Sequence, residues 1–204
     1  MADDRAGDVL GGSADATRPS NPWPRILAFV FVVAVSIGLA AVCVASFASP
    51  PPREVRVPSA NLQPGAPVFT AITTFGHDRQ QRTYGVWTGI DANGRAVALL
   101  SRSAASTCHI RWDATAKVGG VTGVFADPCG AGRWSLGGSV LDGAATKDME
   151  EFRTRRDGGQ VVVDITRVLL GICRMEDATG CSREGAPLER TVPKGALPPD
   201  FATK

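Results

Sequence analysis

The stretch from Ser103 to Gly143 constrains the fold of this chain more than any other segment. It contains two cysteines, and it is interrupted repeatedly by glycines that are typical of turns. The run Leu136–Gly143, which reads LGGSVLDG, predicts a short hairpin with strands at Arg133–Leu136 and Ser139–Leu141. The composition agrees, because glycine and proline are plentiful, at 23 and 14 residues, and aromatic residues make up only 6% of the chain. We therefore expect a loop-rich β protein rather than a helical bundle.

The same stretch resembles the cluster-binding part of the Rieske iron–sulfur family, which includes the iron–sulfur subunit of ubiquinol–cytochrome c reductase. That family carries two loops, C-T-H-x-G-C and C-P-C-H-G-S, followed by an aromatic residue and a return strand L-x-G-x-V-L-x-G. The match to the second loop and the return strand lies at Pro128, Cys129, Trp134 and Leu136–Gly143. The resemblance covers residues 57–168 and implies an all-β fold, a Rieske-like antiparallel β-sandwich.

In that family the first cysteine and the histidine of each loop bind the irons, and the remaining two cysteines form a disulfide. The resemblance places Cys108 and Cys129 on the disulfide cysteines. The four ligand positions fall on residues without a thiolate or an imidazole, namely Ser103, Ala105, Asp127 and Gly130. A Rieske centre needs two thiolates on one iron and two imidazoles on the other. The resemblance therefore implies a degenerate member that keeps the disulfide and has no [2Fe–2S] cluster, other cofactor or metal.

A different alignment of the first loop leaves another interpretation open. Cys108, His109 and Cys129 read as three surviving ligands of a working [2Fe–2S] electron carrier with unusual ligation. Neighbouring side chains of an extended segment point to opposite sides, so Cys108 and His109 are poorly placed to bind one cluster together. His109 is instead expected to contact Asp127 across the loops or to have no specific partner. His77, the other histidine, is expected in a solvated loop rather than at a metal.

The N-terminal part contains a long apolar run without charged residues, Ile26–Ala48. About 20 apolar residues in a helix cross a bilayer core, so residues 25–49 are predicted to be a retained transmembrane helix rather than a cleaved signal peptide. Residues 1–24 are predicted to be a disordered cytoplasmic N-terminus, and residues 50–59 a proline-rich linker. Because a disulfide needs an oxidising compartment, we expect a single-pass protein of the cytoplasmic membrane with its N-terminus inside and its domain outside.

Residues 60–168 are predicted to form the Rieske-like domain, and residues 169–204 a C-terminal extension. Within the domain, strands are expected at Pro67–Phe75, Thr83–Ile90, Arg95–Ser101, Glu151–Arg156 and Gln160–Ile165. In the extension, Cys173 and Cys181 flank a polar turn and are candidates for a second disulfide. The extension is either an ordered wrap over the domain or a loose tail that binds a partner.

Charged and catalytic side chains limit the possible functions. Lysine plus arginine nearly cancel aspartate plus glutamate, at 22 against 20, which argues against a nucleic-acid partner. No catalytic constellation is visible, and the adjacent Glu150 and Glu151 are expected at the solvated surface. By analogy with the family, the chain is predicted to be a non-enzymatic, cluster-free accessory or structural subunit of a membrane electron-transfer complex of the cytochrome bc type. A working [2Fe–2S] carrier and a free-standing exported binding module are the alternatives.

Overall fold

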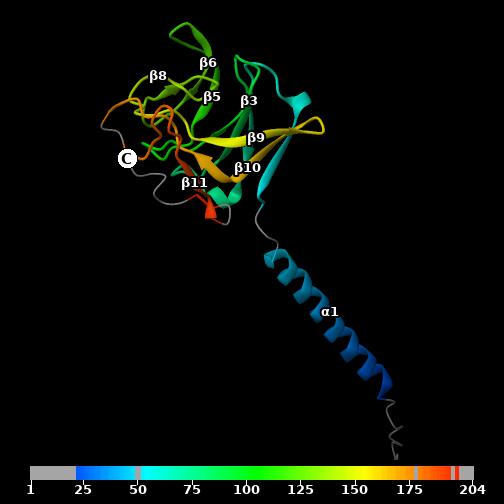
Figure 1. The fold of residues 1–204 in the computed structure, drawn as a ribbon. Coiled ribbons are helices and arrows are strands. Elements are labelled where there is room, and N and C mark those ends of the chain that lie inside the picture. The colour runs from blue at the N-terminus through cyan, green and yellow to red at the C-terminus, as the bar shows by residue number, and fades with distance from the viewer. Residues whose placement is uncertain (1–21, 49–51, 177–178, 194–195, 198–204) are drawn as a thin grey trace, which may run out of the picture. The chain divides into compact units, whose positions relative to one another are not determined.

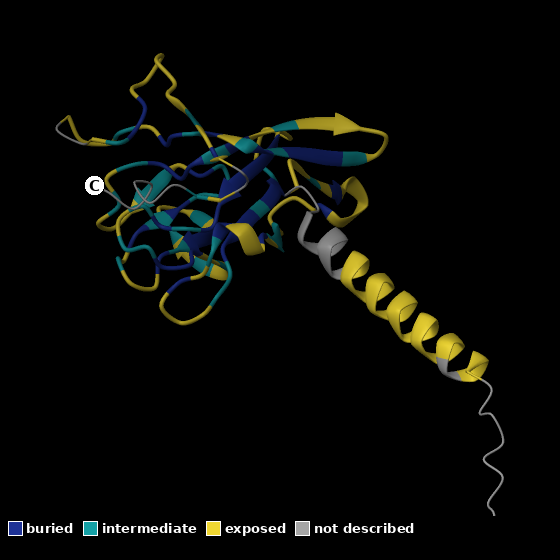
Figure 2. Ribbon diagram, turned by 90° about the horizontal axis from the view of Figure 1, so that it is seen from below, coloured by how far each residue is buried: buried dark blue, intermediate teal, exposed yellow. Residues whose placement is uncertain are grey.

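The computed structural model describes residues 22–48, 52–176, 179–193 and 196–197, and within the N-terminal helix the side chains of residues 25 and 43–48 are outside the described set. The chain divides into two compact units, Met1–Pro50 and Pro51–Lys204. The first unit contains one described helix, α1 (Trp23–Ala48), whose described side chains are exposed (Figures 1 and 2).

The transmembrane prediction for residues 25–49 is contradicted. Among the residues that the structure describes, no helix is both long enough and apolar enough to cross a membrane. The predicted location, single-pass in the cytoplasmic membrane with the N-terminus inside and the domain outside, is therefore wrong. Residues 1–24 were predicted to be disordered, and residues 1–21 of this segment lie outside the described part of the chain.

The second unit is mostly β, as predicted, and its described strands form two antiparallel sheets (Figure 1). The larger sheet has the order β1-β10-β9-β4-β3-β2, and β11 also pairs with β10. Its strands are β1 (Glu54–Pro58), β2 (Val68–Ala71), β3 (Gly85–Ile90), β4 (Ala96–Leu100), β9 (Glu151–Asp157), β10 (Gln160–Leu169) and β11 (Glu189–Thr191). The smaller sheet has the order β5-β6-β7-β8, with β5 (Arg111–Val118), β6 (Val121–Ala126), β7 (Arg133–Trp134) and β8 (Val140–Asp142). Two 3-10 turns, η1 (Ser59–Asn61) and η2 (Thr73–Phe75), flank β2 in sequence.

The centre of the larger sheet consists of β4, β9 and β10. All five residues of β4 are buried, and Val161, Val162 and Val163 of β10 are each at most 1% exposed. β-Branched side chains suit a pleated sheet that is covered by packing, which explains why these runs form the core. A tight turn at Gly158 and Gly159, both with positive φ, joins β9 to β10.

The strands expected at Thr83–Ile90 and Arg95–Ser101 overlap β3 and β4, and the closing hairpin overlaps β9 and β10. The strands β1, β5, β6 and β11 were not predicted. β1 lies inside the stretch expected to be a linker, where it pairs with β10. The β5–β6 hairpin was missed because most of β5 is exposed and polar, so it lacks the apolar signal of a buried strand.

A second, smaller core lies under the hairpins of the smaller sheet. It contains Leu99, Ile110, Phe125, Trp134 and Met149, all of them buried. The aromatic rings pack edge to face or tilted, with Phe125 at 5.7 Å from Trp87 and 4.8 Å from Trp112 between ring centroids. This core fixes the strands from which the two central loops emerge.

The described part of the C-terminal extension is an ordered wrap. β11 pairs with the C-terminal half of β10, and Val192 is buried in the main core. The hydroxyl of Ser182 donates to the carbonyl of Leu170 at 2.7 Å. Of the two predictions for the extension, the described residues therefore agree with the ordered wrap over the domain rather than with the loose tail.

Candidate functional site

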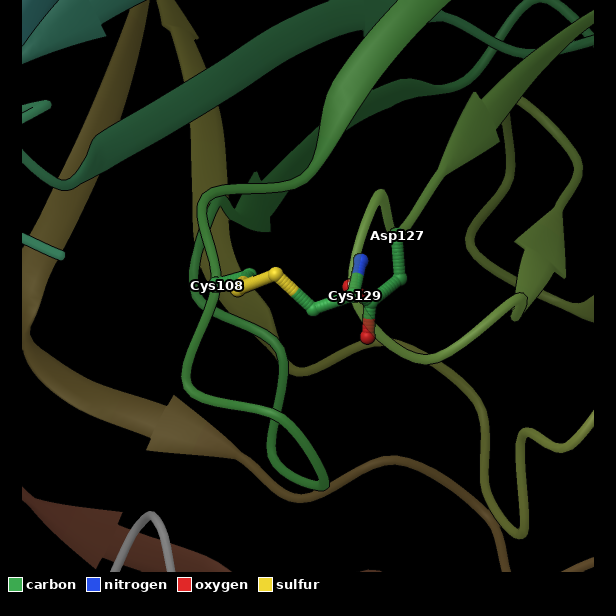
Figure 3. Close-up of side chains that lie close together, drawn as sticks. All are labelled: Cys108, Asp127 and Cys129. Carbon is green, nitrogen blue, oxygen red and sulfur yellow. A yellow bond between two sulfur atoms is a disulfide. The ribbon is translucent and has the colours of Figure 1, made fainter. Parts of the chain in front are cut away.

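Two loops leave the same end of the β5–β6 hairpin, because Arg111 at the start of β5 pairs with Ala126 at the end of β6. The first loop, residues 101–110, connects β4 to β5, and the second, residues 127–132, connects β6 to β7. A disulfide joins Cys108 to Cys129, whose Cα atoms are 6.2 Å apart (Figure 3). This is the pairing that the resemblance implies, and it ties the two loops together covalently.

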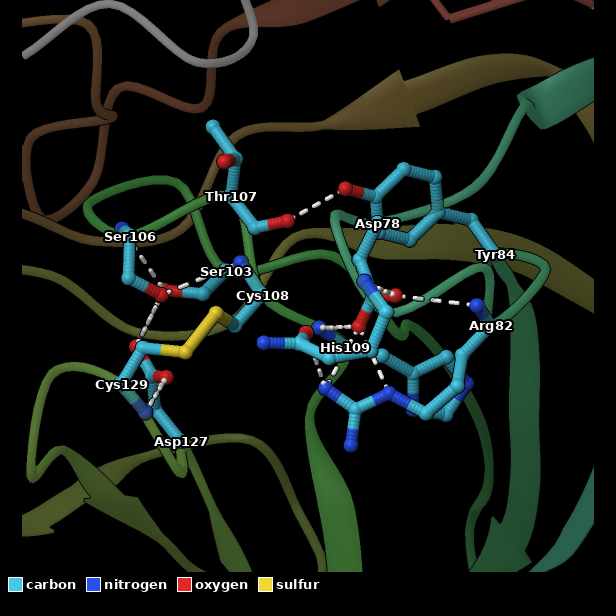
Figure 4. Close-up of a disulfide and its surroundings, with 11 residues drawn as sticks. Asp78, Arg82, Tyr84, Ser103, Ser106, Thr107, Cys108, His109, Asp127 and Cys129 are labelled. Atoms are coloured by element: carbon cyan, nitrogen blue, oxygen red, sulfur yellow. Dashed lines mark hydrogen bonds and ion pairs between the residues drawn. A yellow bond between two sulfur atoms is a disulfide. The ribbon is translucent and has the colours of Figure 1, made fainter.

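Asp127 joins the same loops by hydrogen bonds (Figure 4). Its Oδ2 accepts from the hydroxyls of Ser103 and Ser106, each at 2.7 Å, and its Oδ1 accepts from the backbone N–H of Cys129 at 2.8 Å. Asp127 and Ser103 are each only 2% exposed. Hydrogen bonds to a carboxylate are among the stronger ones in proteins. The two positions that hold ligand cysteines in the family thus carry a hydroxyl and a carboxylate bonded to each other.

The backbone of both loops is shaped around this contact. The first loop folds back on itself, since the backbone N–H of Ser103 donates to the carbonyl of Cys108 at 2.9 Å, and Tyr84 donates its hydroxyl to the carbonyl of Thr107. In the second loop, a Cβ added at Gly130 would lie 2.6 Å from Oδ2 of Asp127. A side chain at position 130 would therefore displace the carboxylate, so glycine there and aspartate at 127 depend on each other.

His109 is turned away from Asp127 and lies beside Asp78 (Figure 4). Its ring packs edge-on against Phe69, with centroids 4.9 Å apart, and its buried Nδ1 has no hydrogen-bond partner among the described residues. Burial lowers the pKa of His109, and the positive charge of Arg82 lowers it further. Of the two alternatives for His109, the contact with Asp127 is not formed, because the ring packs against Phe69 of β2 and Trp87 of β3.

Asp78 is buried and fully engaged with the protein. Its carboxylate forms an ion pair with Arg82 at 2.6 Å and accepts backbone N–H groups of Gln80, Arg82 and His109. Burial alone would raise the pKa of Asp78, but these hydrogen bonds and the charge of Arg82 outweigh it and lower the pKa to about 2. His77 is exposed. Asp78 is therefore a structural carboxylate that orders the segment before β3.

The residues at the two loops do not fit a [2Fe–2S] cluster. Cys108, Asp127 and Cys129 bring ligand-type atoms within 4.8 Å of one another. Both sulfurs, however, are bonded to each other, so neither is a thiolate. His109 does not face these atoms, so the three residues of the alternative alignment, Cys108, His109 and Cys129, do not converge on one point here. Ser103 and Asp127 are hydrogen-bonded to each other rather than arranged around a metal.

A cavity of about 410 Å³ lies beside the loops. All four positions that align with cluster ligands line it, namely Ser103, Ala105, Asp127 and Gly130. Apolar side chains form much of the remaining wall, including Trp134 and Met149 from the small core and Met175 from the C-terminal extension. The structure therefore gathers the positions that the resemblance singled out around one concave site.

The segment 144–150 forms another wall of the cavity and supplies charged groups that the sequence reasoning missed. Glu150 was expected at the solvated surface, but it is only 3% exposed, and its Oε1 lies 2.7 Å from Nζ of Lys147. The same ammonium group donates to the carbonyl of Gly180 at 2.9 Å. Asp148 accepts two hydrogen bonds from Arg174, at 2.7 and 2.6 Å. The spacing of Lys147 and Glu150, three residues apart, was the only signal in the sequence, and it does not indicate burial.

A second disulfide joins Cys173 to Cys181, with Cα atoms 5.3 Å apart. These two cysteines were the candidates for a further disulfide. Between them in sequence lie Met175 and Thr179, which line the cavity. The cross-link and the Asp148–Arg174 contact hold this part of the extension against the domain, so the cavity has a wall that lies outside the resemblance.

Comparisons with known proteins add little. No protein-family model matches the chain, and no curated protein matches it. Among solved structures, the chain is similar to a crystal structure of a protein named as a nitrite reductase NADPH small subunit, with a TM-score of 0.32 and 17% sequence identity. The similarity covers 54% of this chain and 96% of the other. At this TM-score we draw neither the family nor the function of the chain from it.

Proposed function

We propose that the second unit is a Rieske-like domain that has lost its cluster, keeps the disulfide between the two loops and has a hydrogen-bonded hydroxyl and carboxylate at two ligand positions. We propose that it acts as a non-redox accessory subunit of an electron-transfer assembly. The observation that carries this proposal is the contact between Ser103 and Asp127 at 2.7 Å beside the Cys108–Cys129 disulfide. Ser103 and Asp127 lie at two of the four positions from which the family binds iron, and the disulfide lies at the positions of the family's own disulfide.

The chemistry of these groups supports a structural role. A Rieske centre carries electrons because thiolates and imidazoles hold two irons in a defined field. A hydroxyl bonded to a carboxylate has no such redox function, and the disulfide constrains the loops. The choice of a cytochrome bc-type assembly rests on the family resemblance, which is an analogy about function.

The cavity favours a second candidate, a free-standing domain that binds a small molecule. Sites for small molecules are concave, mostly apolar and carry a few polar groups. The cavity beside the loops has this character, with Trp134 and Met149 among its apolar residues and Asp127 and Glu150 among its polar ones.

Elemental analysis and spectroscopy of the purified full-length chain test the absence of a cluster. We expect iron and acid-labile sulfide far below one cluster per chain and no EPR signal after reduction with dithionite, with a cluster-containing Rieske protein prepared in parallel as the positive control. Stoichiometric iron and sulfide with a [2Fe–2S] EPR signal would refute the proposal.

Affinity purification from native extract distinguishes the two candidates. Co-purification of haem-containing cytochrome subunits, identified by their absorption spectra, supports the accessory-subunit role. If the chain elutes without cytochromes under conditions that keep a known complex of the same cells intact, the binding-domain candidate is favoured. A Gly94→Ala variant, changed in a turn remote from the loops, serves as the control for purification losses.

A further inference from the structure

We propose that the cavity beside the two loops binds a small organic cation, a primary amine with an apolar body, whose ammonium group lies against Asp127. The inference rests on the proposed function in one respect, because the cavity is available only if no cluster fills it. It goes further by naming the chemical class of the ligand.

The size and the apolar wall suit a small organic molecule. Pockets for such ligands have volumes of about 300–1,000 Å³, and this cavity has a volume of about 410 Å³. The indole N–H of Trp134 already donates to the carbonyl of Lys147 at 3.0 Å. The ring can therefore offer the cavity only apolar surface and its π face, which attracts cations.

Asp127 has no cationic side chain as a partner among the described residues, unlike the other charged groups of the wall. Lys147 is paired with Glu150, and Asp148 is paired with Arg174. Among the described residues, no lysine or arginine forms an ion pair with Asp127, which accepts hydrogen bonds only from two hydroxyls and one backbone N–H. Burying a charge is costly unless it is paired. A ligand that brings a positive charge lowers this cost, whereas an anion increases it.

The acceptor capacity of the wall matches an ammonium group. A carboxylate offers about four lone-pair sites, and three of those of Asp127 are occupied, so one remains for a donor. Glu150 adds a second buried carboxylate to the wall, but its Oε1 is engaged by the ammonium group of Lys147 at 2.7 Å. An ammonium group has three N–H donors. The wall can therefore accept a donor-rich cation but has no free cation of its own for an anion.

Isothermal titration of the oxidised full-length chain with two sets of probes tests the proposal. Benzylamine, benzyl alcohol and benzoate differ mainly in charge, and butylamine and tryptamine vary the apolar body. We expect at least one amine to bind and benzoate not to bind. Benzylamine should bind about tenfold or more tightly than benzyl alcohol, a difference of about 1.4 kcal/mol or more, because a hydrogen bond to a charged group is stronger than one between neutral groups.

Two variants locate the binding. Asp127→Asn keeps the shape of the side chain and should weaken the binding of benzylamine about tenfold or more, while the affinity for benzyl alcohol stays unchanged. Ala105→Trp fills the cavity from an exposed position and should abolish the binding of every probe, whereas Ala114→Trp, on the exposed part of β5, should not. Because Ala105→Trp leaves the Asp127 contacts in place, it tests the site even if Asp127→Asn fails to fold.

Three results would overturn the inference. These are equal affinity for benzylamine and benzyl alcohol, binding that survives Ala105→Trp, and the absence of binding for every amine. Iron and sulfide analysis of the same preparation separates this failure from failure of the proposed function. A chain without iron that binds no amine overturns only the ligand, whereas a chain with a stoichiometric cluster overturns the cluster-free domain itself.

Discussion

Removal of the Cys108–Cys129 disulfide should destabilise the second unit strongly. The bond closes a loop with a sequence separation of 21 residues. A cross-link of this length removes conformational entropy from the unfolded chain that corresponds to about 3 kcal/mol. Domains of ordinary size have an unfolding free energy of about 5–15 kcal/mol, so the expected loss is a large part of the total. We expect the double variant Cys108→Ser, Cys129→Ser to fold with this reduced margin.

Equilibrium unfolding in urea under oxidising conditions measures the loss. Tryptophan fluorescence is a suitable signal, because Trp87 and Trp134 lie at the small core from which the loops emerge. With an m-value of about 1–3 kcal/mol per molar urea, the midpoint should fall by about 1–3 M. The double variant Cys173→Ser, Cys181→Ser is the matched control. Its loop has a separation of 8 residues, for which the same relation gives about 2.5 kcal/mol.

Reduction supplies the decisive comparison. In dithiothreitol the wild-type chain also loses its cross-links, so its unfolding curve should coincide with that of a variant lacking all four of these cysteines. A loss below about 1 kcal/mol for the Cys108–Cys129 variant under oxidising conditions would contradict the entropic argument. A difference that persists in reductant would also contradict it, because it would then arise from the serine side chains rather than from the bond.

Three further predictions concern single side chains. Because its pKa is lowered from 3.8 to about 2, Asp78 contributes stability that is present above about pH 4 and lost as the pH falls towards 2. Asp78→Asn should flatten the thermal-melting profile in that window and cost roughly 2 kcal/mol at neutral pH. The pKa of His109 is lowered, so stability should decline as the pH falls below about 6.5, and His109→Phe should remove this decline whereas His77→Gln should not. Gly143 has a φ of +86°, and a Cβ there would overlap a backbone carbonyl of the second loop. Gly143→Ala should therefore lower the free energy of unfolding in urea by about 2 kcal/mol or more. The control Gly94→Ala should lower it by about 1 kcal/mol, because Gly94 has open space around it.

The fold was predictable where the sequence carries a local signal. β10 was recognisable from its consecutive valines, and the turn at Gly158 and Gly159 from its paired glycines, because both features express backbone preferences that do not depend on distant residues. β5 was missed for the opposite reason. Its side chains are largely exposed, and its place in the sheet is fixed by pairing with β6 rather than by its own composition.

The candidate site was predictable only in part. Cys108, Cys129 and the four ligand positions came from the resemblance. The structure places all six on two neighbouring loops, and the four ligand positions line one cavity. The buried pair of Lys147 and Glu150 could not be predicted, because its burial depends on how segments distant in sequence pack over it. The wall containing Met175 belongs to the C-terminal extension, whose path no local pattern determines.

The two contacts between the loops act on different states of the chain. The disulfide between Cys108 and Cys129 restricts the unfolded ensemble, so its effect is almost independent of the detailed native geometry. The hydrogen bonds of Asp127 exist only when the loops are correctly placed, and they satisfy a carboxylate that would otherwise be buried without donors. A loop pair that relied on the disulfide alone would be held together without a defined geometry. With Asp127 it also keeps a fixed arrangement of the groups that face the cavity, and a buried carboxylate without a cation persists there as the feature that a ligand can recognise.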